Sequence, residues 1–174
     1  MTSKARDIFI AGLKDAYAME QQAKDTMSSQ ASRLEDYPKV RARADQHMHE
    51  TEMQISRLER ALQIVGEQPS TLKNLATRAA AGVQGMMHGA VSDEILKDTL
   101  SSYAFEHFEI AAYRQLIAMA ETLGEPQIAQ LARESLEEEK AMAGWLDQNM
   151  DDTVRAFTQS HVAPLTQATS QQVP

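Results

Sequence analysis

The sequence of 174 residues contains no cysteine. Disulfide bonds, thiolate zinc sites and iron–sulfur clusters are therefore excluded, and any bound metal must use carboxylate or imidazole ligands. Aromatic residues are also scarce, at 5 % of the chain, whereas Ala, Leu, Met, Gln and Glu are abundant. Because this composition favours helices over strands, we expect an all-α protein.

Basic residues are few as well, with 17 Lys and Arg against 25 Asp and Glu, which gives a net charge of −8. Nucleic acids and anionic membranes bind basic surfaces, so we expect neither as a partner. The apolar patch in residues 1–13 is too short and too often interrupted by charge for a signal peptide or a membrane span. We therefore expect a cytoplasmic protein, whose 43 % apolar residues suffice for one domain with a core.

Four segments place apolar residues at the three-and-four spacing of one helix face. These predicted helices run over 4–34, 38–65, 92–123 and 126–149. Pro38 suits the first turn of the second helix, and Gly66 and Gly124 suit the ends of the second and third.

The connection over residues 66–91 is too long for a tight turn, so we expect a crossover between two helical hairpins. This order predicts a four-helix bundle with one long crossover, confined to residues 1–160. Residues 151–160 are expected to add a short fifth helix. The tail over 161–174, rich in Gln, Thr and Ser, is expected to be mobile.

Each predicted helix carries a glutamate within its apolar stripe, namely Glu20, Glu50, Glu106 and Glu138. Burying an unpaired carboxylate costs several kcal/mol, so four together indicate a shared cationic partner. At about 1.5 Å per residue, Glu20 and Glu50 differ in height by only about 3 Å when counted from the turn between them. Glu109 lies one turn from Glu106 on the same face and joins this layer.

His47 lies one turn before Glu50 and faces the same way. Carboxylates can bridge and neutralise two divalent cations, and imidazole completes a coordination shell suited to iron or manganese rather than copper or structural zinc. We therefore predict two iron ions, or alternatively manganese, held by Glu20, His47, Glu50, Glu106, Glu109 and Glu138. Glu137 and Glu139 are expected in a solvated run. The hydroxyls expected to hydrogen-bond the ligands are those of Tyr17, Tyr103 and Tyr113.

Two other functions stay open at this point. The glutamates could be vestigial in a bundle that serves structure or interaction, because a single glutamate in a stripe is more often a member of an ion pair. A manganese centre could instead disproportionate peroxide, as manganese catalases do.

Four motifs resemble the YciE/YciF family of bacterial stress-response proteins, also called the DUF892 domain, and the match is closer to the YciE branch. They are Ala16–Glu20 (AYAME), His47–Thr51 (HMHET), Tyr103–Ala111 (YAFEHFEIA) and Leu136–Lys140 (LEEEK). The resemblance implies a ferritin-like fold, a homodimer, and a di-iron site with ferroxidase activity.

The wider ferritin-like group places a histidine three residues after the glutamate of its second and fourth helices. In this sequence Met53 follows Glu50 at that spacing, and Ala141 follows Glu138. His47 offers one imidazole from the opposite side of Glu50. The resemblance therefore supports a two-metal site more firmly than any one reaction.

Overall fold

The computed structural model describes residues 3–67 and 94–161, and in that part of the chain it is helical, without strands. Helix α1 spans Ser3–Gln30 and passes into a short 3-10 helix, η1, at Ala31–Leu34. The other three helices are α2 over Pro38–Ile64, α4 over Glu94–Leu123 and α5 over Pro126–His161. The predicted ferritin-like four-helix bundle is confirmed.

The helix ends follow the expected local chemistry. Pro38 occupies the first turn of α2, where its missing amide hydrogen costs no hydrogen bond. Gly66 and Gly124 have φ of 88° and 75°, the left-handed conformation that glycine adopts readily after a helix. The greater part of the predicted crossover, the predicted start of the third helix at residue 92 and the tail over 162–174 lie outside the described residues.

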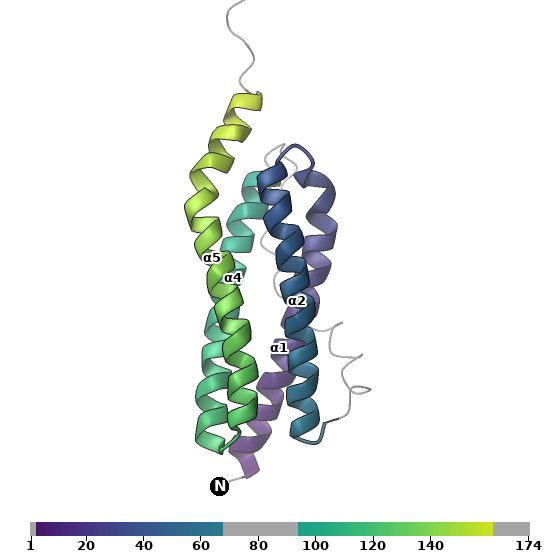
Figure 1. Ribbon diagram of the computed structural model, residues 1–174, viewed down its shortest axis with the longest axis vertical. Helices are drawn as coiled ribbons and strands as arrows, with labels where there is room; N and C mark the ends of the chain where they lie inside the picture. The colour runs from purple at the N-terminus through teal and green to yellow at the C-terminus, as the bar shows by residue number, and fades with distance from the viewer. Residues whose placement is uncertain (1–2, 68–93, 162–174) are drawn as a thin grey trace, which may run out of the picture.

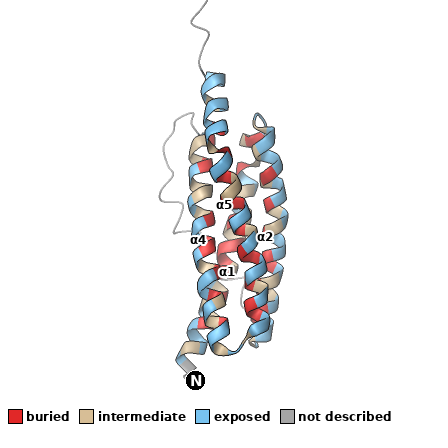
Figure 2. Ribbon diagram, turned by 60° about the vertical axis from the view of Figure 1, so that its left-hand side comes forward, coloured by how far each residue is buried: buried red, intermediate tan, exposed pale blue. Residues whose placement is uncertain are grey.

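One prediction about the fold is wrong. Residues 151–160 are helical, but they continue α5 without a break and do not form a separate fifth helix. No glycine or proline interrupts the chain between Trp145 and His161, so nothing stops the helix there. The last turns of α5 extend past the other helices (Figure 1), and their side chains are mostly exposed (Figure 2).

The four helices form a square in cross-section. Helix α1 packs against α2 and α4, and α5 packs against α2 and, most extensively, α4. The backbones of the diagonal pairs stay further apart, and α2 and α4 meet through side chains such as His47 and Glu106. Helices α2 and α4 run in the same direction, so α2 ends and α4 begins at opposite ends of the bundle (Figure 1). Buried residues face the shared interior (Figure 2). No described helix has an apolar stretch long enough to cross a membrane.

One half of the interior is apolar. We call it the apolar half, and its fully buried members include Phe9, Leu13, Leu62, Leu116 and Ile128. Helices α1 and α4 approach closely here, because a Cβ atom added to Gly12 would lie 3.3 Å from Leu116 Cδ2. Tyr113 lies where this half meets a second, polar region.

Candidate metal centre

The polar region is a layer of acidic side chains across the middle of the bundle. We call it the carboxylate layer, and it draws from all four helices: Glu20, His47, Glu106, Glu109 and Glu139. Each is at most 4 % exposed. The helix spacing predicted this arrangement for the first four, since each lies in the apolar stripe of its helix.

His47 stands at the centre of the hydrogen bonds. Its Nδ1 lies 3.1 Å from Glu50 Oε2, and its Nε2 lies 3.3 Å from Glu106 Oε1 and 3.8 Å from Glu139 Oε2. His47, Glu106, Glu109 and Glu139 each offer a ligand atom within 4.8 Å of the others. One imidazole and three carboxylates therefore converge on a volume that could hold a metal ion.

The carboxylate oxygens of this layer are poorly satisfied. Both oxygens of Glu109 and of Glu139, and one oxygen each of Glu20 and Glu106, are buried without a hydrogen-bond partner. Two neighbouring atoms on α2 share this condition, Thr51 Oγ1 and Gln54 Oε1. Buried polar atoms are rarely left unpaired, and so many acceptors in one place form a group that could hold a cation.

Burial and mutual repulsion raise the pKa values of three carboxyl groups. Burial raises the pKa of Glu20 to about 8 despite the hydrogen bond from Tyr113. The pKa of Glu139 rises to about 10, through burial and the charges of Glu20 and Glu106. The pKa of Glu109 is also raised well above the usual range of a carboxyl group, again mainly by burial. Without a metal, these groups favour the protonated form at neutral pH.

His47 and Glu50 shift in the opposite sense and form an ion pair. Burial alone would lower the pKa of His47, but hydrogen bonds to Glu106 and Glu50 outweigh it and raise the pKa to about 10. For Glu50, the hydrogen bonds from His47 and Gln46 and the charge of Arg43 overcome burial and lower the pKa to about 2. Arg43 Nη1 lies 3.0 Å from Glu50 Oε2, so Glu50 already has a cationic partner at the edge of the layer.

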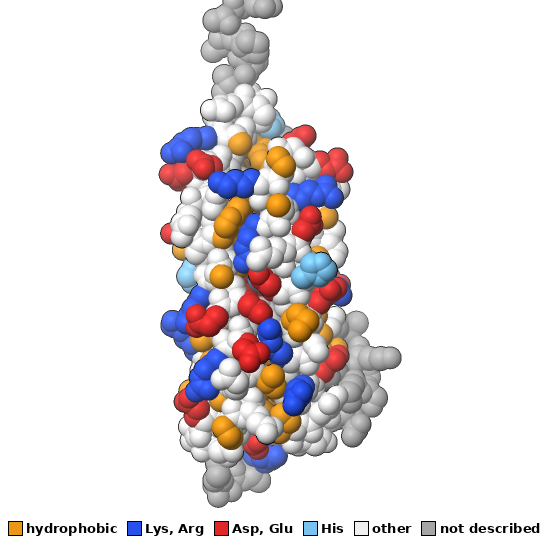
Figure 3. All heavy atoms as spheres, in the orientation of Figure 1, with side chains coloured by type: hydrophobic (Ala, Val, Ile, Leu, Met, Phe, Trp, Pro, Cys, Tyr) orange, Lys and Arg blue, Asp and Glu red, His pale blue; other side chains and the backbone are white. Residues whose placement is uncertain are grey.

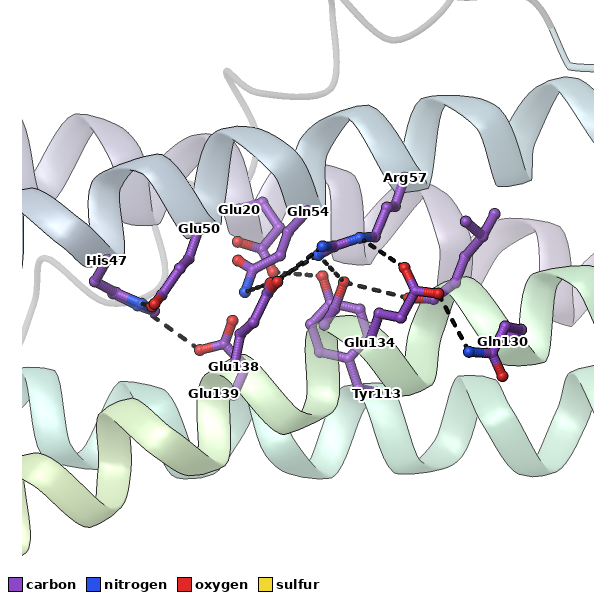
Figure 4. Close-up of polar contacts among 12 residues, drawn as sticks. Glu20, His47, Glu50, Gln54, Arg57, Tyr113, Gln130, Glu134, Glu138 and Glu139 are labelled. Atoms are coloured by element: carbon purple, nitrogen blue, oxygen red, sulfur yellow. Dashed lines mark hydrogen bonds and ion pairs between the residues drawn. The ribbon is translucent and has the colours of Figure 1, made fainter.

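The structure does not bring Glu138 into the layer. Its carboxylate receives two hydrogen bonds from Arg57, of 2.7 and 2.8 Å, and one from Gln54 of 3.0 Å. Figure 4 shows Glu138 turned toward Arg57, while Glu139 lies on the side of His47. The expectation that Glu139 belongs to a solvated run is wrong, because its side chain is fully buried. On α5 the structure thus places Glu139, and not Glu138, in the carboxylate layer.

Of the three tyrosines expected near the ligands, one contacts the layer. The Tyr113 hydroxyl donates a hydrogen bond of 2.6 Å to Glu20 Oε1 (Figure 4), and burial beside Glu20 raises the pKa of this phenol well above its usual range. Tyr17 instead donates to Glu59 at 3.5 Å, and Tyr103 packs its ring edge-on against His107.

The fold and this layer define the class: a ferritin-like four-helix bundle with a buried carboxylate–imidazole cluster. Comparison with known proteins then gives the family. Residues 4–159 match the domain of unknown function DUF892, and the chain belongs to that family, as the motifs predicted.

Relatives of known sequence and structure agree. The chain is 32 % identical over 146 residues to protein YciF of Escherichia coli strain K12, which covers 78 % of this chain and 83 % of YciF. It is similar to a crystal structure of a Xanthomonas campestris protein, with 34 % identity, a TM-score of 0.76, and coverage of 91 % of this chain and 98 % of the other. The structure of YciF, described as an E. coli stress protein, gives 25 % identity and a TM-score of 0.71 over 88 % of this chain and 99 % of YciF.

A third structure is similar at a lower level. YcfI of Rhodopseudomonas palustris, for which the description proposes a structural role, shares 28 % identity with a TM-score of 0.64, covering 84 % of this chain and 98 % of that one. The descriptions of these relatives name a stress protein and a structural protein and state no reaction.

Proposed function

We propose that the carboxylate layer binds two divalent metal ions, iron or alternatively manganese, and that the protein uses them in oxidation–reduction chemistry. One observation carries the proposal: six carboxylate oxygens of Glu20, Glu106, Glu109 and Glu139 are buried without a partner beside the His47 imidazole. Oxygen-rich coordination with one imidazole suits iron and manganese better than copper.

The charges support two ions. Arginines pair with Glu50 and Glu138, but in the described part of the chain none pairs with Glu20, Glu106, Glu109 or Glu139. Once deprotonated, these four carboxylates carry −4, and two divalent cations carry +4. Glu20 and Glu50 adjoin the four residues whose ligand atoms converge, and we include both as ligands.

Bound iron or manganese would supply one-electron chemistry with oxygen or peroxide. The protein residues do the rest. The imidazole of His47 is held between Glu50 and Glu106, which fixes its ring plane. Tyr113 orients Glu20 through a short hydrogen bond, and the apolar half closes the layer on one side against water.

This chemistry suits a protein that oxidises Fe²⁺ or consumes peroxide under stress, and the similarity to the E. coli stress protein YciF supports that setting. The resemblance noted in the sequence adds the expectation of a homodimer, and the interrupted apolar patch in residues 1–13 adds that of a cytoplasmic location. Manganese catalase activity is distinguished from ferroxidase activity by oxygen evolution from peroxide with Mn²⁺ but not with Fe²⁺.

The three consecutive glutamates on α5 offer a matched test, because their exposed fractions fall from 71 % for Glu137 to 25 % for Glu138 and 0 % for Glu139. Protein purified without chelator should contain about two metal ions per chain. Glu139→Gln should lower the Fe²⁺ and Co²⁺ affinity at least about tenfold. Glu137→Gln is the control and should bind as the unaltered protein does. Less than one metal per chain, with equal affinities in both variants, contradicts the proposal.

A structural or interaction role is the second candidate, and the description of the relative YcfI favours it. In that case the purified protein is metal-free, and adding Fe²⁺, Mn²⁺ or Co²⁺ leaves its thermal unfolding unchanged. A metal-dependent rise of the melting temperature in the unaltered protein, absent from Glu139→Gln, rules this candidate out.

A further inference from the structure

A cavity of about 60 Å³ lies between α1 and α4 and ends at the carboxylate layer. We call it the α1–α4 cavity. Small side chains leave it unfilled: Ala23 and Thr26 on α1 face Ser101 and Ser102 on α4. The two helices that meet closely at Gly12 thus leave space between them about three to four turns further on.

The floor of the cavity is part of the proposed metal centre. His47 and Glu106 line it, and Glu106 Oε2 is one of the buried oxygens without a partner. A second cavity of about 50 Å³ shares Met27 and Ser102 in its lining, and the same His47 and Glu106 line it as well. Both spaces therefore meet at the same two proposed ligands.

The charge of the lining restricts what can occupy the α1–α4 cavity. Apart from Glu106 and His47 at its floor, its lining residues are uncharged, among them Ala23, Met27 and Phe105. An ion would have to give up its hydration without a countercharge on the way, whereas an uncharged molecule would not.

The opposite side of the layer contrasts with this one. There Arg57 binds Glu138 and lies 3.3 Å from Glu134 Oε2, so charged groups close the α2–α5 side. Figure 3 shows acidic and basic side chains gathered over the middle of that face. Charged side chains thus cover the α2–α5 side of the layer, and neutral side chains line the α1–α4 side.

The size of the cavity fits a very small guest. One water needs about 10–15 Å³ of such space, so about 60 Å³ holds about four waters, or one molecule of two heavy atoms with room to move. Molecules of drug size need several hundred Å³ and are excluded.

We infer that the α1–α4 cavity is the binding and access site for a small uncharged molecule, of the size of dioxygen, hydrogen peroxide or nitric oxide, which reaches the metal centre past Ala23 and Ser102. The inference rests on the proposed function for the purpose of that access, and the cavity itself can be tested without a metal.

Two substitutions should close the cavity from opposite helices, Ala23→Leu and Ser102→Leu. The control is Ala104→Leu, which adds the same side chain to the exposed outer side of α4, away from the cavity. Met27→Ala should enlarge the space, since Met27 lines both cavities. Because the two substitutions lie on different helices, the test remains possible if one of the two variants fails to fold.

The first measurement is nitric oxide binding to the Fe²⁺-loaded protein without oxygen, followed by stopped-flow absorbance and electron paramagnetic resonance. We expect the association rate to fall at least about tenfold in Ala23→Leu and Ser102→Leu, because the cavity would have to open for the guest to pass. Ala104→Leu should match the unaltered protein, and Met27→Ala should be as fast or faster. Co²⁺ affinity should stay within about threefold in all four variants, since none alters a proposed ligand.

The second measurement places xenon in crystals of the metal-free protein, since apolar cavities bind it. Xenon should occupy the α1–α4 cavity of the unaltered protein and of Ala104→Leu, but not that of Ser102→Leu. Absence of xenon from the unaltered protein, or equal nitric oxide rates in folded, Co²⁺-binding plug variants, overturns the inference. Failure of the unaltered protein to bind Co²⁺ contradicts the proposed function instead, and the xenon result still decides the cavity.

Discussion

The apolar half and the carboxylate layer are built by the same four helices, yet they treat their buried atoms in opposite ways. In the apolar half, Phe9, Leu13 and Leu62 fill the interior with carbon and leave nothing unsatisfied. In and beside the carboxylate layer lie all the buried side-chain oxygens without a partner that the described residues contain. The first region stabilises the fold, and the second costs stability that a bound cation would recover.

The largest expected effect is a pH dependence that belongs to the layer alone. A carboxyl group whose pKa is raised in the folded state stabilises most below its unfolded pKa, near 4.5, and loses that contribution as the pH rises through the folded value. For Glu20, with a folded pKa of about 8, the loss between pH 4.5 and pH 7 is about 3 kcal/mol, at about 1.4 kcal/mol per unit. Glu139 extends the decline toward pH 10.

His47 acts in the same direction. Because its pKa is raised from 6.5 to about 10, its contribution to stability is complete below pH 6.5 and is lost as the pH rises through 10. Glu50, lowered to about 2, contributes constantly above 4.5 and loses its contribution only in acid. Urea unfolding of the metal-free protein from about pH 5 to pH 9 should therefore show falling stability. A stability that stays constant or rises with pH would show that these carboxyl groups are not protonated in the folded protein.

The next largest effect is expected in the apolar half. Leu62→Ala removes a side chain that is 1 % exposed and should cost about 2–5 kcal/mol, from lost burial and the cavity left behind. The cost should be the same with and without metal and nearly constant with pH, because Leu62 is apolar and belongs to the apolar cluster. A loss that varied with metal would mean that the two regions are coupled.

Replacing an acid of the layer should have the opposite sign. Glu109→Leu removes two buried oxygens that have no partner and should raise the stability of the metal-free protein by about 1–4 kcal/mol. The same variant should lose most of the stabilisation by Fe²⁺ or Co²⁺, measured by calorimetry. Glu137→Leu, on the exposed side of α5, is the control and should change neither quantity. A destabilised Glu109→Leu protein would show that Glu109 is satisfied in a way the structure does not reveal.

The smallest effect is expected at the charged rim between α2 and α5. Glu134 is 47 % exposed and reaches Arg57 at 3.3 Å, so Glu134→Gln should change the stability by less than about 1 kcal/mol. Metal affinity should also be unchanged, because Arg57 keeps its two hydrogen bonds to Glu138. A large fall in metal affinity would show that Glu134 and Arg57 contribute to the metal centre.

Helix spacing predicted most of the bundle and of the layer from sequence. The stripes of α1, α2 and α4 contain Glu20, His47, Glu106 and Glu109 in the phase that the structure shows. On α5 the stripe that contains Glu138 also passes through Leu131 and Trp145. The structure instead buries Glu139, with Ala132, Leu136 and Leu146 on its side of the helix. Both phases follow the three-and-four spacing, and three consecutive glutamates offer no contrast to choose between them.

Contacts between distant residues lay beyond the periodicity. Arg57 is 81 residues from Glu138, and nothing in the local pattern of α2 assigns that arginine to that carboxylate. The α1–α4 cavity depends in the same way on Ala23 and Ser102 meeting across the bundle. Spacing fixes which face of a helix is buried, but the pairing of faces depends on the packing of the whole core.

Because of the run Glu137–Glu139, insertions and deletions in the α4–α5 turn should affect the carboxylate layer differently. Each residue rotates an α-helix by about 100°. One residue added before α5 would therefore move Glu138 to the position that Glu139 occupies, and two added residues would move Glu137 there. Removing one residue would instead bring in Lys140. Insertions there would keep a carboxylate in the cluster, whereas a deletion would put an ammonium group beside the proposed cations.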